Sequence, residues 1–537
     1  MEVFATGSGR VRGVRAAEGV VAVLGIPYAA PPFGADRFKA PRPAEPWAGV
    51  RDCTRFGPVA PQSAELPGAP VWAPGDEDVL SLNVWTPAPC LSPGPLPVLV
   101  WFHGGACTFG SSAQPDFDGT ALARAGLVVV TVNYRLGFEG FGHVPASQPT
   151  PDRAPDPTAY RDPTPDPIAD PAPAPTPATV AYPENRGLLD QVAALRWVRE
   201  NIAGFGGDPD AVTVAGQSSG AASVACLMVM DRARGLFRRA IAHSPASPCY
   251  PPALAAATTR ELAAAAGCPA TAEGLTALSP EALVRAGDAV VERYPNDPGS
   301  GSRHYDPSLY APVLDGDVLP VDPLTGMAEG RCRDVDLLVC HTTEEYWLLD
   351  AVGSCAEVAT DERLRAFAAD FGLPEGLVDT YRARAPRAPV REIYLEVFGD
   401  LLFCAYGERL ADAHARAGGR ARLARFDRRR EGPDGPVRAW HCADVPFAFG
   451  TLHDRAVAFL VGGGSPTPAD DELSARMVRA WADFARTGNP GWPALAGADT
   501  DTDRIMVWRA DGDGGVRVRP EGTRVRWAGA EFPLLRA

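Results

Sequence analysis

The chain has 537 residues, of which 46% are hydrophobic and 22% are charged, close to the average composition of globular proteins. A wholly disordered or fibrous chain is therefore excluded, and the length allows either several domains or one large α/β unit. Acidic side chains outnumber basic ones by 66 to 51, which gives a net charge of −15. This charge would repel nucleic-acid phosphates and anionic lipid headgroups, so we expect neither nucleic acid nor a membrane as a partner.

The start of the sequence and its cysteines indicate a reducing compartment. The first residues, Met-Glu-Val-Phe-Ala-Thr-Gly, lack the basic start and apolar stretch of a secretory signal, and no window reaches 18 uninterrupted apolar residues. The eleven cysteines are an odd number, form no C-x-x-C pair and are too sparse for a disulfide scaffold. We therefore expect a cytoplasmic protein whose thiols are mostly reduced and buried.

In chain order, short runs of β-branched and apolar residues alternate with helical patterns. The clearest strands are expected at residues 97–103, 126–133, 211–215 and 335–340. Their apolar runs continue without alternation, as expected for strands that are buried on both faces. Residues 188–201 place apolar side chains at helical spacing between the second and third of these strands. The pattern predicts an α/β protein with a mainly parallel sheet.

Residues 145–183 interrupt this pattern with thirteen prolines, regularly spaced aspartates and almost no aliphatic side chains. Such a composition cannot form a packed core and favours an exposed, extended chain. A linker between two domains is the alternative, because linkers share this composition. The sheet pattern is interrupted in the middle of a unit, however, so we predict one domain over residues 1–537 with a disordered insertion at 145–183.

Residues 216–220, Gly-Gln-Ser-Ser-Gly, stand between the predicted strand at 211–215 and a helix-like stretch. A G-x-S-x-G sequence in this context is typical of a nucleophile elbow, a turn so tight that only small residues fit two positions on either side of the serine. Gly216 and Gly220 meet that demand. An ordinary loop is the alternative for a lone motif, but the strand–turn–helix context favours Ser218 as a nucleophile.

A serine that attacks an ester also needs donors for the oxygen that becomes negative. Residues 103–106, His-Gly-Gly-Ala, end the predicted strand at 97–103, and their small side chains leave backbone N–H groups unobstructed. The N–H of Ser219, directly after the nucleophile, would supply another donor. Gly-Gly after a strand can also be a plain turn, but together with the elbow this segment indicates an oxyanion hole.

The general base should be a histidine that follows the nucleophile and the acid in the chain. The eight candidates are His103, His143, His243, His304, His341, His414, His441 and His453. His414 stands in a helical pattern and is expected to be solvated, and His453 stands in a polar turn. His441 lies in a short loop between large apolar residues that could hold an imidazole and exclude water, so it is the best candidate.

The acid that orients the histidine should lie between them, just past the end of a strand. Glu344 and Glu345 follow the predicted strand at 335–340 in this way. Side chains of adjacent residues point in different directions, so at most one of the two faces the base. A solvated loop is the alternative for such a pair.

No motif indicates a cofactor or a metal. Gly7 and Gly9 lack the third glycine of a dinucleotide-binding loop, and we expect a hairpin turn there. The histidine and cysteine spacings of known metal motifs are absent from the sequence. Cys107 and Cys442 adjoin the predicted oxyanion turn and base, but no base is placed beside either, so we expect packing thiols.

These segments, taken together, resemble the type-B carboxylesterases, the α/β-hydrolase family that includes cholinesterases and bacterial p-nitrobenzyl-type esterases. The resemblance runs from about residue 9 to residue 493 and rests on an ordered series of segments at 24–29, 82–85, 133–137, 185–191, 205–209 and 481–490. It implies an α/β-hydrolase fold with a large, mostly parallel central sheet flanked by helices. It also implies Ser218 as nucleophile, Glu345 as acid and His441 as base. The oxyanion donors that it implies are Gly105, Ala106 and Ser219.

Some positions depart from the family pattern. Ser219 stands where the family usually has alanine, and Cys340 stands where the strand before the acid usually ends in glycine. The usual Gln-Ser-Gly reads His-Ser-Pro at residues 243–245. Ala60 and Val79 occupy the positions of a frequent disulfide, so both partners are absent together, which fits an intracellular chain.

We therefore expect a carboxylic ester hydrolase that forms an acyl-enzyme on Ser218, acts on small to medium acyl esters and needs no cofactor. An acyltransferase or an amidase could use the same triad with another acceptor or substrate, and the sequence leaves these alternatives open. A silent binding protein is a further alternative, because the family includes adhesion ectodomains without the triad. The chain keeps every catalytic position, which disfavours it.

Overall fold

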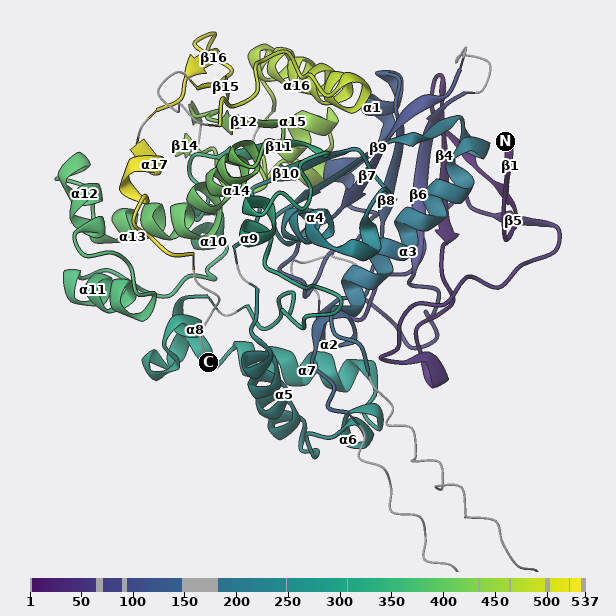
Figure 1. Ribbon diagram of the computed structural model, residues 1–537, viewed down its shortest axis with the longest axis horizontal. Helices are drawn as coiled ribbons and strands as arrows, with labels where there is room; N and C mark the ends of the chain where they lie inside the picture. Colours follow the sequence, from purple (N-terminus) through teal and green to yellow (C-terminus); the bar gives the residue numbers. More distant parts are fainter. Residues whose placement is uncertain are drawn as a thin grey trace, which may run out of the picture.

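The computed structural model describes residues 2–63, 71–88, 94–146, 182–247, 249–306, 308–432, 435–462, 465–497, 503–520 and 522–532. A sheet of eleven strands runs through this described part of the chain (Figure 1). Its strands are β3 (Val14–Ala17), β4 (Val20–Pro27), β6 (Ser81–Pro87), β7 (Leu96–Phe102), β8 (Val128–Val132), β9 (Gly207–Gln217), β10 (Arg239–His243), β11 (Asp336–Thr342), β12 (Ala421–Phe426), β15 (Arg504–Trp508) and β16 (Gly515–Val518).

The order of the strands across the sheet is β16-β15-β12-β11-β10-β9-β7-β8-β6-β4-β3. The seven strands from β15 to β8 are mutually parallel. Antiparallel strands are added at both edges, β16 at one and β6, β4 and β3 at the other. The predicted large, mostly parallel sheet is therefore confirmed.

The four strands expected from the sequence are β7, β8, β9 and β11, and the expected helix is α3 (Arg186–Asn201). Burial on both faces explains their continuous apolar runs, as predicted. In β8, for example, every residue is buried. Within β7, Val98 and Val100 pack into the core on one face of the sheet, and Leu99 and Trp101 pack into the core on the other. A strand with helices on both faces needs apolar side chains on both.

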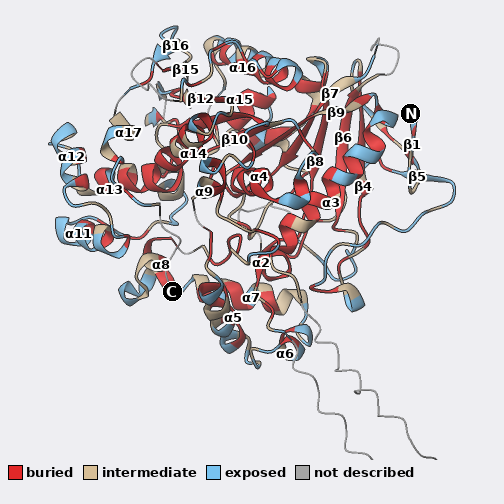
Figure 2. Cartoon of the chain, viewed as in Figure 1, coloured by how far each residue is buried: buried red, intermediate tan, exposed pale blue. Residues whose placement is uncertain are grey.

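Helices cover both faces of the sheet, and the strands between them are buried (Figure 2). On one face, α1 (Thr120–Arg124), α15 (Val445–Phe449) and α16 (Pro468–Thr487) share a core with the strands. On the other, α3 is joined by α4 (Ser219–Val229), α9 (Pro323–Ala328) and α14 (Ala405–Arg416). The elbow serine immediately precedes α4, so the packing of this helix on the sheet fixes the position of the serine.

Two further groups of helices lie beyond these layers (Figure 1). One group is α5 (Pro252–Ala266), α6 (Ala272–Thr276) and α7 (Pro280–Val291), and the other is α11 (Asp361–Asp370), α12 (Leu377–Arg384) and α13 (Val390–Gly399). The second group has its own aromatic core around Phe367, Tyr394 and Phe398. A π-helical turn, Asp400–Cys404, joins α13 to α14.

The remaining described elements are short. The hairpin predicted around Gly7 and Gly9 is confirmed, because β1 (Val3–Thr6) and β2 (Gly9–Arg12) pair antiparallel across them. The other strands are β5 (Val50–Asp52), β13 (Arg430–Gly432) and β14 (Gly435–Val437). The other α-helices are α2 (Gly137–Phe141), α8 (Ser302–Tyr305), α10 (Trp347–Ala351) and α17 (Gly522–Arg526).

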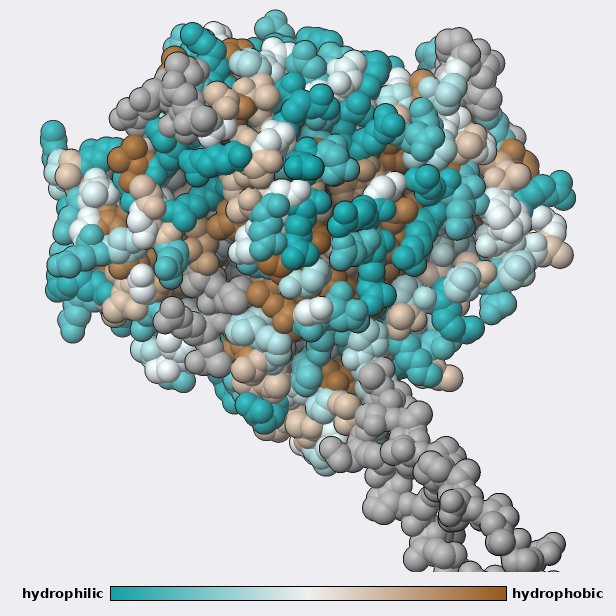
Figure 3. All heavy atoms as spheres, viewed as in Figure 1, coloured by the Kyte–Doolittle hydropathy of each residue, from teal (hydrophilic) through white to brown (hydrophobic). Residues whose placement is uncertain are grey.

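On the face shown in Figure 3, hydrophobic residues are scattered in small groups among hydrophilic ones. None of the described helices has the length and apolar character that a membrane crossing requires. The insertion predicted at 145–183 falls on residues 147–181, which lie outside the described residues, so its disorder stays a prediction. The assignment of residues 1–537 to one domain also stays a prediction.

Candidate active site

Ser218 occupies the turn between β9 and α4, with φ at 56° and ψ at −124°. This backbone conformation is strained for a residue with a side chain, and the surrounding backbone holds it there. A Cβ atom added at Gly220 would lie 2.1 Å from the carbonyl oxygen of Phe102, and one at Gly216 would lie 2.5 Å from that of Gly220. Both positions therefore require glycine, and the strand–turn–helix context predicted for this serine is confirmed.

The turn after β7 lies against the elbow. A Cβ atom added at Gly104 would be 3.1 Å from the Cβ of Ser218, so a larger residue would crowd the serine. Gly105 adopts a φ of 113°, and a Cβ there would be 2.0 Å from the carbonyl oxygen of Phe109. In the described part of the chain, the N–H groups of Gly105, Ala106 and Ser219 donate to no protein acceptor. They are therefore free to bind an oxygen of a ligand.

Glu345 and His441 form a close buried pair. The Nδ1 atom of His441 lies 2.6 Å from Oε2 of Glu345. The main-chain N–H of His441 also donates to the main-chain carbonyl of Glu345 at 3.2 Å. The other carboxylate oxygen, Oε1, accepts hydrogen bonds from the Ser244 hydroxyl at 2.6 Å and from the Thr342 N–H at 2.8 Å. A buried carboxylate with three donors is fully paired, which fixes its orientation.

The neighbouring Glu344 points away from this pair. It accepts hydrogen bonds from Nη1 of Arg438 at 2.7 Å and from the main-chain N–H of Ala439 at 2.9 Å. The two glutamates thus diverge as expected, and the alternative of a solvated loop is excluded. Glu344 ties the acid loop to the segment that leads into His441.

The Nε2 atom of His441 lies 2.9 Å from Nε2 of Gln217, the residue before the elbow serine. Because the Glu345 carboxylate can only accept, Nδ1 of His441 carries the proton and Nε2 presents its lone pair. The Gln217 amide therefore donates to the atom that a general base would use. This contact was not predicted from the sequence, because it joins residues far apart in the chain and depends on a side-chain rotamer.

Two further groups around His441 were not predicted from the sequence. The ring of Phe403 packs on the imidazole with centroids 4.2 Å apart, and it belongs to the π-helical turn that no motif reveals. Beneath the elbow, Nδ1 of His243 pairs with Oδ2 of Asp444 at 2.7 Å, and its Nε2 accepts from Trp481. The main-chain carbonyl of His243 also accepts a hydrogen bond from the N–H of Ser218 at 2.9 Å.

The other histidines lie elsewhere, and one expectation about them is wrong. His414 is not solvated but fully buried, with Nε2 at 2.9 Å from the Val335 carbonyl, because its helix packs that face against the sheet. His453 is exposed and pairs with Asp471. His103 stacks on Tyr134, and burial lowers the pKa of its imidazole to about 4, so it stays neutral.

Cysteine and acidic side chains gather in two buried clusters whose candidate ligand atoms lie within 4.8 Å of one another. The clusters are His243, Cys340 and Asp444, and His341, Glu345 and Cys404. Protein hydrogen bonds use Nδ1 of His243 and Oδ2 of Asp444 in the first cluster, and Nδ1 of His341 and both carboxylate oxygens of Glu345 in the second. Burial raises the pKa of the Cys107 thiol to about 12 and that of Cys442 well above its usual range, as expected for packing thiols.

The parallel sheet with a serine elbow at the end of its central strand defines an α/β-hydrolase. Comparison with known proteins then identifies the family. The model of the carboxylesterase family matches residues 1–152 and 177–504, and the chain belongs to this family. The resemblance to type-B carboxylesterases seen in the sequence is therefore confirmed.

The chain is similar to several characterised esterases. It is 35% identical over 508 residues to the para-nitrobenzyl esterase of Bacillus subtilis (strain 168), and the aligned region covers 92% of each chain. It is 32% identical over 523 residues to the phenmedipham hydrolase of Pseudarthrobacter oxydans, covering 95% of this chain and 93% of that one. The Geobacillus stearothermophilus carboxylesterase EST55 at pH 6.2 aligns with a TM-score of 0.79 and 34% identity, covering 98% of this chain and 99% of the other. The protein is a serine carboxylesterase, an enzyme that hydrolyses carboxylic esters.

Proposed function

We propose that the enzyme cleaves small to medium acyl esters through an acyl-enzyme on Ser218. His441 is the general base, Glu345 is the acid that orients it, and the N–H groups of Gly105, Ala106 and Ser219 form the oxyanion hole. The observation that carries this proposal is the 2.6 Å contact between Glu345 and His441. It supports a proton on Nδ1 and a lone pair on Nε2, the tautomer that can accept the proton of a serine hydroxyl once the Gln217 amide releases Nε2.

In the first half of the reaction, Ser218 Oγ attacks the carbonyl carbon while its proton passes to Nε2 of His441. The imidazolium then donates this proton to the leaving alcohol. In the second half, His441 takes a proton from water as the water oxygen attacks the acyl carbon. The imidazolium then returns this proton to Ser218 Oγ as the bond between the serine and the acyl group breaks, which releases the carboxylic acid. The Gln217 amide must give up its 2.9 Å contact with Nε2 before each transfer, because the lone pair accepts only one proton.

Three free N–H groups suit the oxygen that becomes negative in both halves of the reaction. Each donor of this kind contributes about 3 kcal/mol to transition-state stability in comparable sites. The side chain of Ser219 is not needed for this role, because the proposed donor is its main-chain N–H. The departure from the usual alanine therefore leaves the proposed hole complete.

The test is labelling with an organophosphate, followed by intact-mass spectrometry and peptide mapping. We expect one adduct, located on Ser218, together with complete loss of p-nitrophenyl ester hydrolysis. Ser218→Ala should prevent both labelling and turnover, and Ser219→Ala is the matched control that should retain both. An adduct on another residue, or full activity of Ser218→Ala, would overturn the proposal.

A second measurement separates hydrolysis from acyl transfer. A p-nitrobenzyl ester is a suitable substrate, since a relative is a para-nitrobenzyl esterase. A competing alcohol is added, and the products are quantified. We expect free acid as the main product, and a transferase would instead give mainly the new ester.

A further inference from the structure

His341 lies at the end of β11, close to the proposed acid, and only 3% of its surface is exposed. Both of its ring nitrogens face hydrogen-bond acceptors. Nδ1 lies 2.9 Å from the carbonyl oxygen of Thr342, and Nε2 lies 3.4 Å from Oε1 of Glu408. A neutral imidazole has only one N–H, so either tautomer would turn a lone pair toward an acceptor. Nε2 makes no hydrogen bond among the described residues and lies only at ion-pair distance from Glu408, and the imidazolium alone would place an N–H beside both oxygens.

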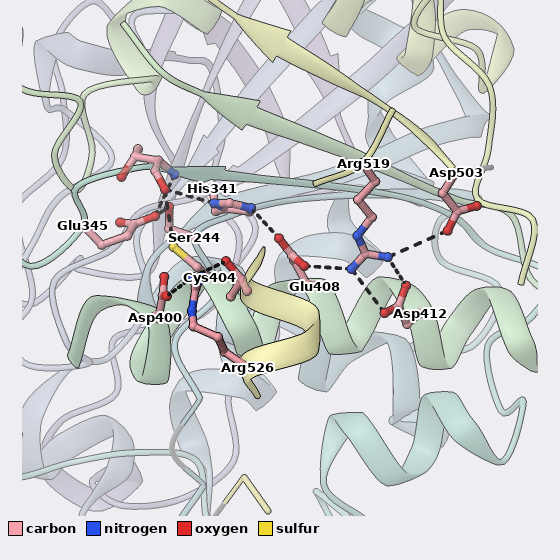
Figure 4. A network of polar contacts seen from close by, with 12 residues as sticks. Ser244, His341, Glu345, Asp400, Cys404, Glu408, Asp412, Asp503, Arg519 and Arg526 are labelled. Carbon is pink, nitrogen blue, oxygen red and sulfur yellow. Dashed lines mark hydrogen bonds and ion pairs between the residues drawn. The ribbon is translucent and has the colours of Figure 1, made fainter. Parts of the chain in front are cut away.

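The charges behind Glu408 favour the same protonation state. Arg519 donates to Oε2 of Glu408 at 2.8 Å and to Oδ1 of Asp412 at 2.6 Å, and its Nη1 is 3.8 Å from Asp503. Three carboxylates thus surround one guanidinium in the interior (Figure 4). A further positive charge at His341 brings this cluster closer to neutrality, which reduces the cost of burial.

The other end of this network reaches the proposed acid. The N–H of Thr342 donates to Oε1 of Glu345, and the carbonyl of the same residue accepts from His341. A ring nitrogen of His341 also lies within 4.8 Å of a carboxylate oxygen of Glu345. Figure 4 shows His341 between Glu345 on one side and Glu408 with Arg519 on the other. The protonation of His341 therefore affects Glu345 through both a hydrogen-bonded segment and a short-range charge.

We propose that His341 is held as an imidazolium and acts as a positioning residue, which fixes the acid loop and balances the charge of Glu345. This inference rests on the proposed roles of Glu345 and His441. His341 does not touch the reacting atoms. It holds Thr342 in place from one side and lies beside Glu408 on the other, so the Glu345 carboxylate stays aimed at His441.

The groups that face His341 come from several elements. They are Thr342 on its own strand, Glu345 in the following loop, Arg425 on β12, Cys404 in the π-helical turn and Glu408 on α14. Burial and Arg425 lower the pKa of His341, but Glu408 and the Thr342 carbonyl outweigh them, so the pKa is raised. Burial raises the pKa of Glu408, whereas His341 and Arg519 lower it, to about 2.

The sign of the pH effect follows from this pair. Because the pKa of His341 is raised, its ion pair with Glu408 is complete below the usual pKa of a histidine and is lost as the pH rises through the raised pKa. The acid loop then loses its support, and kcat should decline in the alkaline range.

The first experiment reads the protonation of His341 directly. Histidine is isotope-labelled in the full-length enzyme, and the ring nitrogen signals are recorded by NMR from neutral to alkaline pH. The signals of His341 are assigned by their absence in His341→Gln. We expect an imidazolium for His341 and a neutral ring for His414, a buried histidine whose pKa burial lowers. A neutral His341 near neutral pH would overturn the proposal, and labelling of Ser218 does not affect this readout.

The second experiment compares pH profiles of kcat and kcat/KM. His341→Gln should remove the alkaline decline of kcat, because the ionisation that releases the acid loop is lost. Glu408→Gln keeps the histidine but removes its counter-charge, so the alkaline decline should move to lower pH. His414→Gln is the matched control and should leave the alkaline decline in place. An unchanged alkaline decline in the first two variants would overturn the positioning role.

If His341→Gln does not fold, two other measurements replace it. The pH profile of Glu408→Gln then tests the positioning role, and the NMR titration of the wild type, with His341 assigned by sequential labelling, tests the imidazolium. Failure of the proposed function is distinguishable from failure of this inference. Organophosphate labelling away from Ser218, combined with an imidazolium at His341, would remove the triad but leave the charge assignment. Labelling at Ser218, combined with a neutral His341, would leave the triad in place but overturn the charge assignment.

Discussion

The two halves of the candidate site are built in different ways. The elbow and the oxyanion turn are made of backbone, and their geometry depends on glycines at positions 104, 105, 216 and 220, where there is no room for a Cβ atom. The acid–base half is made of side chains from the residue after β10, the loop after β11 and the segment before α15. A backbone site tolerates almost no change in size, whereas a side-chain site depends on which groups donate and accept.

This difference predicts two kinds of damage. Enlarging a glycine in the first half should displace the main chain and so affect folding as well as activity. Exchanging a polar group in the second half should leave the fold in place and affect the protonation or aim of His441. Variants in each half therefore test whether the two halves respond differently.

The largest effect is expected for Glu345→Gln. The amide would donate to Nδ1 of His441 and force the proton onto Nε2, which then cannot accept from Ser218. We expect kcat to fall by on the order of 10⁴-fold with little change in substrate binding, as for the corresponding loss in a serine protease triad. Steady-state kinetics and a thermal melt measure the two quantities. A fall of less than tenfold would mean that another group orients His441.

In the backbone half, Gly220→Ala is expected to reduce kcat by at least about 100-fold, because small displacements of a nucleophile are costly. The added Cβ would meet the Phe102 and His103 carbonyl oxygens at 2.1 Å and 2.5 Å, so the melting temperature should fall too. Gly529→Ala is the matched control, since no atom lies within 4 Å of its Cβ position. A stable, active Gly220→Ala enzyme would show that the elbow tolerates more than its geometry allows.

The same difference explains what the sequence could predict. The elbow, the oxyanion turn and the four central strands lie in short continuous segments whose residue sizes and apolar runs carry the signal. His441 and Glu345 were predicted from chain order and from the family resemblance, and the structure brings them into contact. The contacts of Ser244, Gln217, Phe403 and His341 join segments far apart in the chain or depend on rotamers, so no local pattern reveals them. The burial of His414 was missed because helical spacing alone did not show which face packs on the sheet.

A smaller effect is expected for Ser244→Ala, which removes one of the donors to Oε1 of Glu345. The Thr342 N–H still satisfies that oxygen, so the carboxylate keeps its charge but loses part of its alignment. Hydrogen bonds to charged groups contribute about 1.5–3 kcal/mol, which corresponds to a fall in kcat of about tenfold to 100-fold. Ser223→Ala is the matched control, because its hydroxyl is buried in α4 with no partner among the described residues. Equal effects of the two variants would contradict a role for the Ser244 hydroxyl.

The smallest effect is expected for Glu344→Gln, and it tests whether the two adjacent glutamates are separable. In the wild type, the Glu344 carboxylate accepts from both Arg438 and the Ala439 N–H. Glutamine would still accept from Ala439, but its NH₂ group would face Arg438 and could not accept from it. Arg438 is partly exposed, so water can replace the lost contact and the electrostatic cost is small.

For Glu344→Gln we therefore expect kcat within about threefold to fivefold of the wild type and a modest fall in melting temperature, measured side by side with Glu345→Gln. Arg438→Gln should give a similar result, and the double variant should be no worse than either single one, because both changes remove the same contact. A loss in Glu344→Gln as large as that in Glu345→Gln would mean that the aim of His441 depends on the whole loop. The acid–base half would then resemble the backbone half, where position matters more than the identity of one donor or acceptor.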